Sequence, residues 1–364
     1  MDSSQKLTNT DVKKLNKNRI FRLIYNSDKI SRQEIADRLG LSLPTVNQNL
    51  KMLMEDGLIE YVGNFTSTGG RRAQAITISN NARKAISVNI KADYINVDVV
   101  GLKGQIIYSM AVKVHFSKSS AYIEKLTDAV RHAADYVGAD ADDILGVGIT
   151  VPGILDDEKQ ILISAPPLKA KNYDFTRLIS AIDYPVVVMN DARAEAYADH
   201  WFNGKPQDEK IYIMLGEGVG GAYINASAIR NGVHNRGGEF GHMVIHPGGK
   251  QCLCGKKGCL EAYVSEKVLS SELDMTLDNF FELAAQGNKN NSNVLDEYMD
   301  DLALGINNIY TMMDCDIVLG GTVAPYLKQY ESSIKERLVN DYSFDTDADS
   351  DEVKLQKIIT QKYL

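Results

Sequence analysis

The chain has 364 residues, of which 44% are hydrophobic and 24% charged, and its formal net charge is −8. This length is enough for two or three domains, and the composition is that of an ordinary globular protein. No apolar run approaches the roughly 20 residues of a membrane span, and the first residues lack the apolar core of a signal peptide. Four cysteines, three of them in one cluster, do not suggest a disulfide framework. We therefore expect a cytoplasmic protein.

The charge is distributed unevenly along the chain. Residues 1–80 contain 12 Lys/Arg and 8 Asp/Glu, a net charge of +4, whereas the remainder contains 28 Lys/Arg and 40 Asp/Glu, a net charge of −12. A basic segment on an acidic body is typical of a DNA-binding domain joined to a different module. The predicted organisation is a DNA-binding domain over residues 1–80 and an effector domain over residues 84–364.

The first elements are helical. Apolar residues recur at helical spacing over Val12–Leu23. Ser31 and Glu34 form a capping-box pattern at the start of a second helix, Arg32–Leu39, which Gly40 ends.

A third helix follows at once. Ser42 is a suitable N-cap, Pro44 suits the first helical turn, and the helix stops at Gly57. Two short capped helices separated by a tight turn predict a helix-turn-helix. Its small core would contain Ile35, Ala36, Leu39, Leu41, Val46, Leu50 and Leu53.

The third helix has a polar face that can contact base edges or phosphates. The residues of this face are Ser42, Thr45, Asn47, Gln48, Asn49 and Lys51. Taken alone, such a polar face is typical of a solvated helix surface. Strands over Leu58–Val62 and Ala73–Ile78 follow, however, joined by a polar turn with Arg71 and Arg72 at its base. A helix-turn-helix with a basic hairpin is a winged helix, whose wing arginines would bind the DNA backbone or minor groove.

From about residue 84 the pattern becomes that of an α/β domain. Strand-forming residues alternate over Ala85–Val100, and after a glycine-containing turn they continue over Gln105–Val114. Ala121–Val137 has helical periodicity. Short apolar strands that end in polar or glycine-rich loops follow at Ile144–Thr150, Val186–Met189 and Ile211–Leu215. This alternation predicts an α/β fold with binding sites at strand ends.

Three cysteines and a histidine form a metal-ligand pattern. Cys252, Cys254 and Cys259 fall within eight residues, and His242 precedes them by ten. One imidazole and three thiolates satisfy tetrahedral Zn²⁺, and a Cys-x-Cys pair cannot easily form its own disulfide. Reduced thiols packed in a turn are the alternative. The spacing favours a closed structural zinc site.

The residues around this cluster resemble the signature of the ROK family, named for repressors, open reading frames and kinases. The matching segments are Gly238–His242, Gly258–Glu261, Ile149–Gly153 and Val188–Ala194, and the resemblance covers about residues 10–330. It implies a winged helix-turn-helix followed by a two-lobed, actin-like sugar-kinase fold. It also implies that the zinc loop over residues 242–261 braces a sugar pocket.

The resemblance further implies which residues bind sugar hydroxyls: Asn190, Asp191, Glu239, His242 and Glu261. The chemistry is suitable, because a carboxylate can accept hydrogen bonds from two vicinal hydroxyls. Zinc on one ring nitrogen of His242 would fix the tautomer and direct the other nitrogen at a hydroxyl.

Phosphate transfer is a separate question, because the phosphate loops depart from the family pattern. ROK kinases carry Asp-x-Gly-Gly-Thr near the start of the domain, where this chain has Asn89–Asp93 without glycines. Glu217 stands where the kinases have threonine in a second loop, and Thr322 replaces a glycine of the adenosine-side motif. Glycines let backbone N–H groups approach phosphate. We therefore predict no catalytic residue, and Asp191 is a sugar ligand rather than a base.

The sequence thus predicts a non-enzymatic, sugar-responsive repressor of carbohydrate-utilisation genes, most similar in the family to xylose repressors. Its partners would be operator DNA, a free sugar and a second copy of the chain, since winged helices commonly bind palindromic DNA as dimers. There are two alternatives. One is an active ATP-dependent ROK sugar kinase with a DNA-binding head, and the other is a scaffold that binds a partner protein. The sugar, the operator and the sign of the sugar effect stay open, and the acidic tail Asp345–Leu364 has no assigned role.

Overall fold

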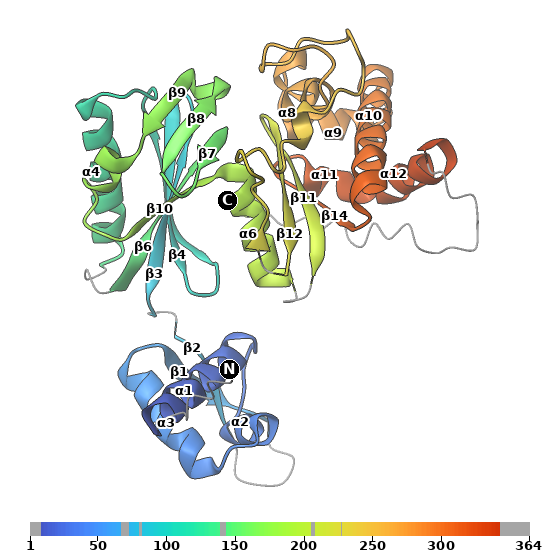
Figure 1. Cartoon of the computed structure of the whole chain (residues 1–364). Helices are drawn as coiled ribbons and strands as arrows, with labels where there is room; N and C mark the ends of the chain where they lie inside the picture. The colour runs from blue at the N-terminus through green and yellow to red at the C-terminus, as the bar shows by residue number, and fades with distance from the viewer. Residues whose placement is uncertain are drawn as a thin grey trace, which may run out of the picture. The chain divides into compact units, whose positions relative to one another are not determined.

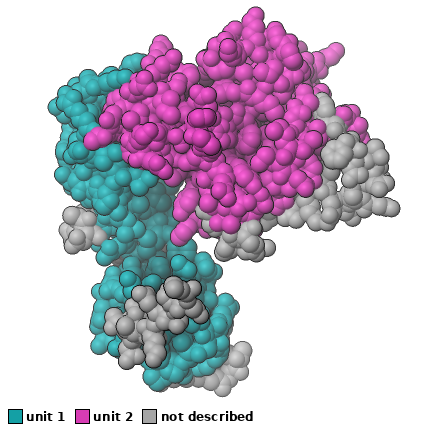
Figure 2. Space-filling view, viewed as in Figure 1, with its two compact units in different colours: residues 1–149, 177–187 teal, residues 150–176, 188–364 magenta. Residues whose placement is uncertain are grey.

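The computed structural model describes residues 9–66, 73–79, 82–138, 143–204, 208–226 and 228–342 (Figure 1). They form two compact units, coloured separately in Figure 2: residues 1–149 with 177–187, and residues 150–176 with 188–364. Within the described ranges, no helix is both long enough and apolar enough to cross a membrane. The tail Asp345–Leu364 lies outside the described residues.

The first unit begins with a winged helix. Its elements are α1 (Asn9–Tyr25), α2 (Arg32–Leu39), α3 (Leu43–Glu55) and the antiparallel pair β1 (Ile59–Asn64) and β2 (Gln74–Ile78).

Local capping sets the helix boundaries here. The Ser31 hydroxyl accepts a hydrogen bond from the Glu34 amide at 3.2 Å, and Gly40 ends α2 with a φ of 63°. The capping box is only half formed, because the Glu34 carboxylate pairs with Arg38 instead, at 2.5 Å. The start and end of α2 agree with the sequence prediction.

Isoleucines from several elements fill the core of the winged helix. Ile20 and Ile24 of α1, Ile35 of α2 and Ile76 of β2 are fully buried. Among the residues predicted for this core, Ile35, Ala36, Val46, Leu50 and Leu53 are buried, whereas Leu39 and Leu41 pack at its rim. The contribution of α1 shows that this helix is part of the winged helix.

A five-stranded sheet and a helix follow. The strand order is β10-β6-β3-β4-β5, with β3 (Lys84–Ile90), β4 (Tyr94–Gly101), β5 (Ile106–Lys113), β6 (Ile144–Val151) and β10 (Val186–Asn190). Helix α4 (Ser120–Tyr136) packs against β3, β4 and β5, and its bounds lie within one residue of the predicted ones (Figure 1). The interpretation of residues 85–100 as one strand was wrong, because they form the antiparallel pair β3–β4 with a turn at residues 91–93.

The second unit contains two sheets. The smaller consists of β7 (Ile154–Asp156), β8 (Ile161–Ala165) and β9 (Ala170–Asp174). The larger has the order β13-β12-β11-β14, with β11 (Glu209–Leu215), β12 (Val219–Asn225), β13 (Ala228–Ile229) and β14 (Asp316–Gly320). Strand β11 pairs antiparallel with β12 and parallel with β14.

Helices cover both faces of the larger sheet. Helix α6 (Asp191–Asn203) packs on one face against Tyr212 and Met214 of β11. The neighbouring residues Ile211 and Ile213 point into the core on the opposite face, as strand alternation requires. That core is closed by a set of helices: α7 (Glu261–Val264), α8 (Glu266–Leu269), α9 (Leu277–Ala285), α10 (Lys289–Met313), α11 (Ala324–Leu327) and α12 (Glu331–Arg337). The short helix α5 (Thr176–Ile179) lies between β9 and β10 in the chain.

Candidate metal cluster, ligand site and DNA-binding face

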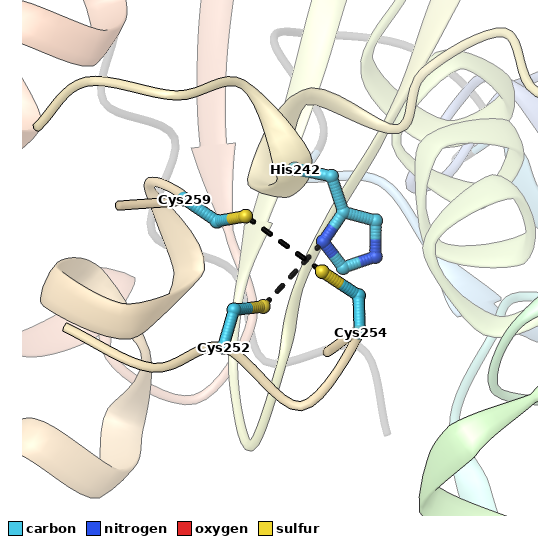
Figure 3. Close-up of side chains that lie close together, drawn as sticks. All are labelled: His242, Cys252, Cys254 and Cys259. Carbon is cyan, nitrogen blue, oxygen red and sulfur yellow. Dashed lines mark hydrogen bonds between the residues drawn. The ribbon is translucent and has the colours of Figure 1, made fainter. Parts of the chain in front are cut away.

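The four predicted metal ligands converge on one point. Figure 3 shows the sulfur atoms of the three cysteines around the ring of His242. The four ligand atoms lie within 4.8 Å of one another, with 3.7 Å between the sulfurs of Cys254 and Cys259. The Cys252 sulfur is 3.8 Å from Nδ1 of His242. A tetrahedral zinc ion with Zn–S bonds of about 2.3 Å separates its sulfur ligands by about 3.8 Å, so the spacing fits such an ion.

Tight turns bring these ligands together. The Gly255 amide donates to the Cys252 carbonyl at 3.0 Å, and Gly255 has a φ of 87°. Gly258 has a φ of 82°, and a Cβ there would lie 1.8 Å from the His246 carbonyl oxygen. Burial raises the pKa of the Cys252 and Cys259 thiols, so a bound cation is what would hold them as thiolates. The cluster is therefore a Cys₃His set that could hold a metal ion.

Asn190 and Asp191 occupy the junction of β10 and α6. Both are buried, and the Asn190 side-chain oxygen caps α6 by accepting from the Arg193 amide at 3.0 Å. The Asn190 amide nitrogen donates to the Gly153 carbonyl at 2.9 Å and to Oδ1 of Asp191 at 3.2 Å. Oδ1 of Asp191 also accepts from the Ala192 amide at 2.9 Å. Asn190 is thus largely occupied in holding the Asp191 carboxylate in place.

The ring of His242 lies between the metal cluster and Glu239. Its Nδ1 faces Cys252, and its Nε2 is 3.8 Å from Oε2 of Glu239. Burial raises the pKa of Glu239, the charges of His242 and Arg193 oppose this, and Asp191 and Glu261 add to it. These ionisable groups therefore lie within electrostatic range of one another.

Glu261 joins the metal cluster to the glycine-rich turn after β11. Its Oε2 accepts a hydrogen bond from the Val219 amide at 3.1 Å. Its Oε1 lies 3.4 Å from the Cys252 sulfur. The structure thus groups the predicted sugar-binding residues Asp191, Glu239, His242 and Glu261 in one acidic cluster beside the metal ligands, with Asn190 bonded to Asp191.

The glycine-containing turns that follow β11 and β14 are connected to each other. The Thr322 hydroxyl donates to Oε2 of Glu266 at 2.5 Å and lies 3.4 Å from the Leu215 carbonyl oxygen. The Glu266 amide donates to the Gly216 carbonyl at 2.8 Å. Glu217 is exposed on the first of these turns. Two carboxylates, Glu217 and Glu266, therefore lie at or beside these glycine turns.

The candidate DNA-binding face lies on α3. Ser42, Asn47, Gln48 and Lys51 are exposed and Thr45 is partly exposed. Asn49 was wrongly placed on this face, because it is buried and donates its side-chain amide to the Thr45 carbonyl at 2.8 Å. The wing residues Arg71 and Arg72 lie outside the described residues.

Arg32 is a cation on this side of the winged helix that sequence reasoning missed. Its guanidinium reaches Oδ1 of Asn47 on α3 at 3.5 Å and Oε1 of Gln74 on β2 at 3.2 Å. Arg32 is the first residue of α2. In the sequence, the only signal for its location is that it directly follows the N-cap Ser31. Arg32 adds an exposed positive charge next to Asn47 of this face and Gln74 of β2.

Comparison with known proteins agrees with both halves of this description. The ROK family profile matches residues 85–358, and a winged helix-turn-helix DNA-binding profile matches residues 15–60. The chain belongs to the ROK family. The predicted fold class, a winged helix-turn-helix followed by the ROK sugar-kinase fold, is confirmed.

The relatives of this ROK chain include regulators. It is 30% identical over 309 residues to the xylose repressor of Bacillus spizizenii, covering 82% of this chain and 80% of the relative. It is 29% identical over 319 residues to the xylose repressor of Bacillus subtilis, covering 85% and 82%. A solved ROK family transcriptional regulator, a homolog of the Escherichia coli MLC protein, superposes with a TM-score of 0.67 at 22% identity, covering 90% of this chain and 88% of that one.

Proposed function

We propose that this ROK protein is a sugar-responsive transcriptional repressor that binds operator DNA through its winged helix. The observation that carries the proposal is the presence, in one chain, of a winged helix and of a ROK domain whose predicted hydroxyl-binding residues lie within electrostatic range of one another beside the candidate metal ligands. The similarity to two xylose repressors supports the same function and makes xylose the first effector to test.

The acidic cluster is the proposed sugar site. Asp191 and Glu239 would accept hydrogen bonds from neighbouring hydroxyls, and Nε2 of His242 would bind a third polar group. Glu261, which already accepts from the Val219 amide through one oxygen, has its other oxygen beside Cys252. Asn190 contributes mainly by fixing Asp191.

The metal is proposed to be zinc, held by His242, Cys252, Cys254 and Cys259. Three thiolates and an imidazole are soft and borderline ligands that suit zinc in a closed tetrahedral site, and they do not suit magnesium or calcium. Nδ1 of His242 would hold the zinc, and Nε2 would stay free to face Glu239, so the metal would link the loop to the ligand site.

Phosphate transfer is not part of the proposed function. A kinase would need backbone N–H groups free to approach the phosphates, whereas here the Thr322 hydroxyl and the backbone amide of Glu266 connect the two glycine turns, and the Glu266 carboxylate lies between them. Glu217 adds a further negative charge at the first turn. A coupled assay with magnesium, ATP and a broad sugar panel should stay at background, and turnover on the order of 1 per second or faster would establish the kinase alternative.

Because the chain would act on operator DNA, its proposed compartment is the cytoplasm, and a homodimer would match a palindromic operator. Sugar would bind the form with low operator affinity better than the DNA-bound form. By thermodynamic reciprocity, operator DNA then weakens sugar binding by the same factor, typically about 5- to 150-fold.

The deciding experiment titrates sugars into a complex of the full chain with a fluorescently labelled operator. Pentoses including xylose, hexoses, N-acetyl sugars and their phosphates form the panel. Release of DNA by one free sugar supports the repressor. Tighter DNA binding would make that sugar a corepressor, and no response to any sugar, together with no thermal shift, would remove the sensing function.

A further inference from the structure

One charged side chain close to the proposed sugar site has no role so far. Arg193, in the first turn of α6, has a side chain that is only 3% exposed. Its Nη1 lies 3.2 Å from Oδ2 of Asp157, and its Nη2 donates to the Asn235 carbonyl oxygen at 2.7 Å. A buried guanidinium destabilises a fold unless it is paired and hydrogen-bonded, so these two partners explain how the charge is tolerated.

The partner Asp157 is itself held in place. Oδ2 of Asp157 also accepts from the Asn231 side-chain amide at 2.6 Å. Gln160 donates to the Asp157 carbonyl at 2.6 Å and accepts from the Val188 amide at 3.1 Å. The turn after β7 is therefore tied to the strand that leads into α6, and the carboxylate presented to Arg193 cannot easily move away.

Asn231 and Asn235 belong to the segment that leads to Glu239. The Gly237 amide donates to the Asn231 carbonyl at 2.8 Å, which closes the segment on itself. Gly238 has a φ of 91°, and a Cβ there would lie 2.1 Å from the Gly221 carbonyl oxygen of β12. The segment is thus held on one side by backbone packing against β12 and on the other by Arg193 and Asp157.

We propose that Arg193, acting with Asp157 and Asn231, is a positioning residue that sets Glu239 opposite Asp191 in the ligand site. Glu239 and Arg193 also interact electrostatically. The inference rests on the proposed sugar site, and it assigns to Arg193 the placing of a ligand group rather than contact with the sugar. A guanidinium suits this role because its donors point in fixed directions, so one side chain can hold a carboxylate and a carbonyl together. Directional hydrogen bonds to a ligand need their acceptors placed within about 0.5 Å.

The test compares two buried cations, Arg193 on α6 and Lys210, which pairs with α6. Arg193→Met removes the proposed positioning contact. Lys210→Met is the matched control, because Lys210 pairs with Asp199 of α6 at 2.5 Å and both side chains are buried. Each variant leaves a carboxylate without its cation, the partly exposed Asp157 in one case and the buried Asp199 in the other, so the thermal midpoint should fall in both. Only Arg193→Met should weaken sugar binding, on the order of 10- to 100-fold in calorimetry, while operator binding without sugar stays within about twofold of the wild type.

A second substitution separates the fork geometry from the charge. Arg193→Lys keeps the positive charge but replaces the planar fork, whose two nitrogens contact Asp157 and Asn235 separately, by a single ammonium, so sugar affinity should fall between those of the wild type and Arg193→Met. Wild-type affinity in Arg193→Lys would overturn the positioning role. Equal losses of sugar affinity in Arg193→Met and Lys210→Met would overturn it as well, because the effect would then be one of general stability.

Hydrogen exchange gives a readout that does not depend on any sugar. Amides of residues 231–239 should exchange faster in Arg193→Met, while Lys210→Met leaves them at the wild-type rate. Unchanged exchange in this segment would contradict the inference even if a sugar binds. If the wild type binds no sugar, the proposed function fails, and the exchange rates still decide whether Arg193 holds the segment.

Discussion

The acidic cluster at the start of α6 and the glycine turns after β11 and β14 lie in the same unit, yet they differ in what they present to a ligand. In the acidic cluster, carboxylates such as Asp191 and Glu239 are grouped beside the candidate metal ligands, of which His242 is one. At the glycine turns, the Thr322 hydroxyl and Glu266 bond to each other and to the backbone.

This difference indicates how a sugar-kinase fold can serve as a sensor. Carboxylates that accept hydrogen bonds from hydroxyls are sufficient for sugar binding, whereas phosphate transfer also needs unobstructed N–H groups and a way to offset phosphate charge. On the proposed function, a chain with the first set of groups and with Glu217 and Glu266 at the second would bind sugar without phosphorylating it. The following predictions test this comparison from the largest expected effect to the smallest.

Loss of the metal should have the largest effect. We expect Cys252→Ser to abolish tight binding of about one zinc per chain and to loosen the loop that carries His242, because structural zinc contributes directly to folding. Metal analysis of protein purified without added zinc, together with sugar titration, checks this. Cys315→Ser is the matched control, since this free cysteine lies outside the cluster. A normal sugar response in zinc-free protein would defeat the claim.

The metal cluster could be predicted from the sequence because its ligands are close together in the chain. Cys252, Cys254 and Cys259 share one short loop, and the glycines that turn it are visible in the same stretch. The helix caps Ser31 and Ser42 were predictable for the same reason, since capping depends on a residue and its neighbours three positions on.

Features that depend on distant partners could not be predicted. Arg193 meets Asp157 across 36 residues, and Asp157 meets Asn231 across 74, so no local pattern connects them. Asn49 was misplaced because its polarity was given more weight than its helical position, directly before the buried Leu50. The turn between β3 and β4 was missed because residues 91–93 contain no glycine or proline, and Asp93 is their only residue typical of turns.

Removal of one carboxylate from the acidic cluster should have the next largest effect. Asp191→Ala should weaken sugar binding on the order of 100-fold, because each hydrogen bond to a charged group contributes about 1.5–3 kcal/mol and a carboxylate can accept more than one. Operator binding should stay unchanged, so the variant should repress but ignore the sugar. Glu195→Ala is a control on the same helix, where Glu195 accepts from the Tyr212 hydroxyl. Equal sugar affinity in Asp191→Ala and the wild type would remove Asp191 from the site.

Changes on the DNA-binding face should have intermediate effects of two kinds. Gln48→Ala should alter base preference, by about 1–3 kcal/mol for a good contact. Lys51→Ala should weaken binding to specific and unrelated DNA alike and reduce the salt dependence of binding. The double change of Arg71 and Arg72 to alanine should have the same effect. Binding curves at several salt concentrations separate the two kinds. A fragment without residues 1–80 that still bound the operator would overturn the assignment of this face.

Nucleotides should have the smallest effect. At 100 times its dissociation constant a bound sugar stabilises the native state by about 2.7 kcal/mol, which a thermal scan detects easily. Magnesium with a non-hydrolysable ATP analogue should give no shift in the wild type, because Glu217 and Glu266 repel phosphate and Thr322 closes the turns. Combining Glu217→Thr with Thr322→Gly should restore only weak binding, since residues 89–93 still lack the glycines of a phosphate loop. A nucleotide shift in the wild type as large as the sugar shift would erase the distinction between the two regions and favour a working kinase.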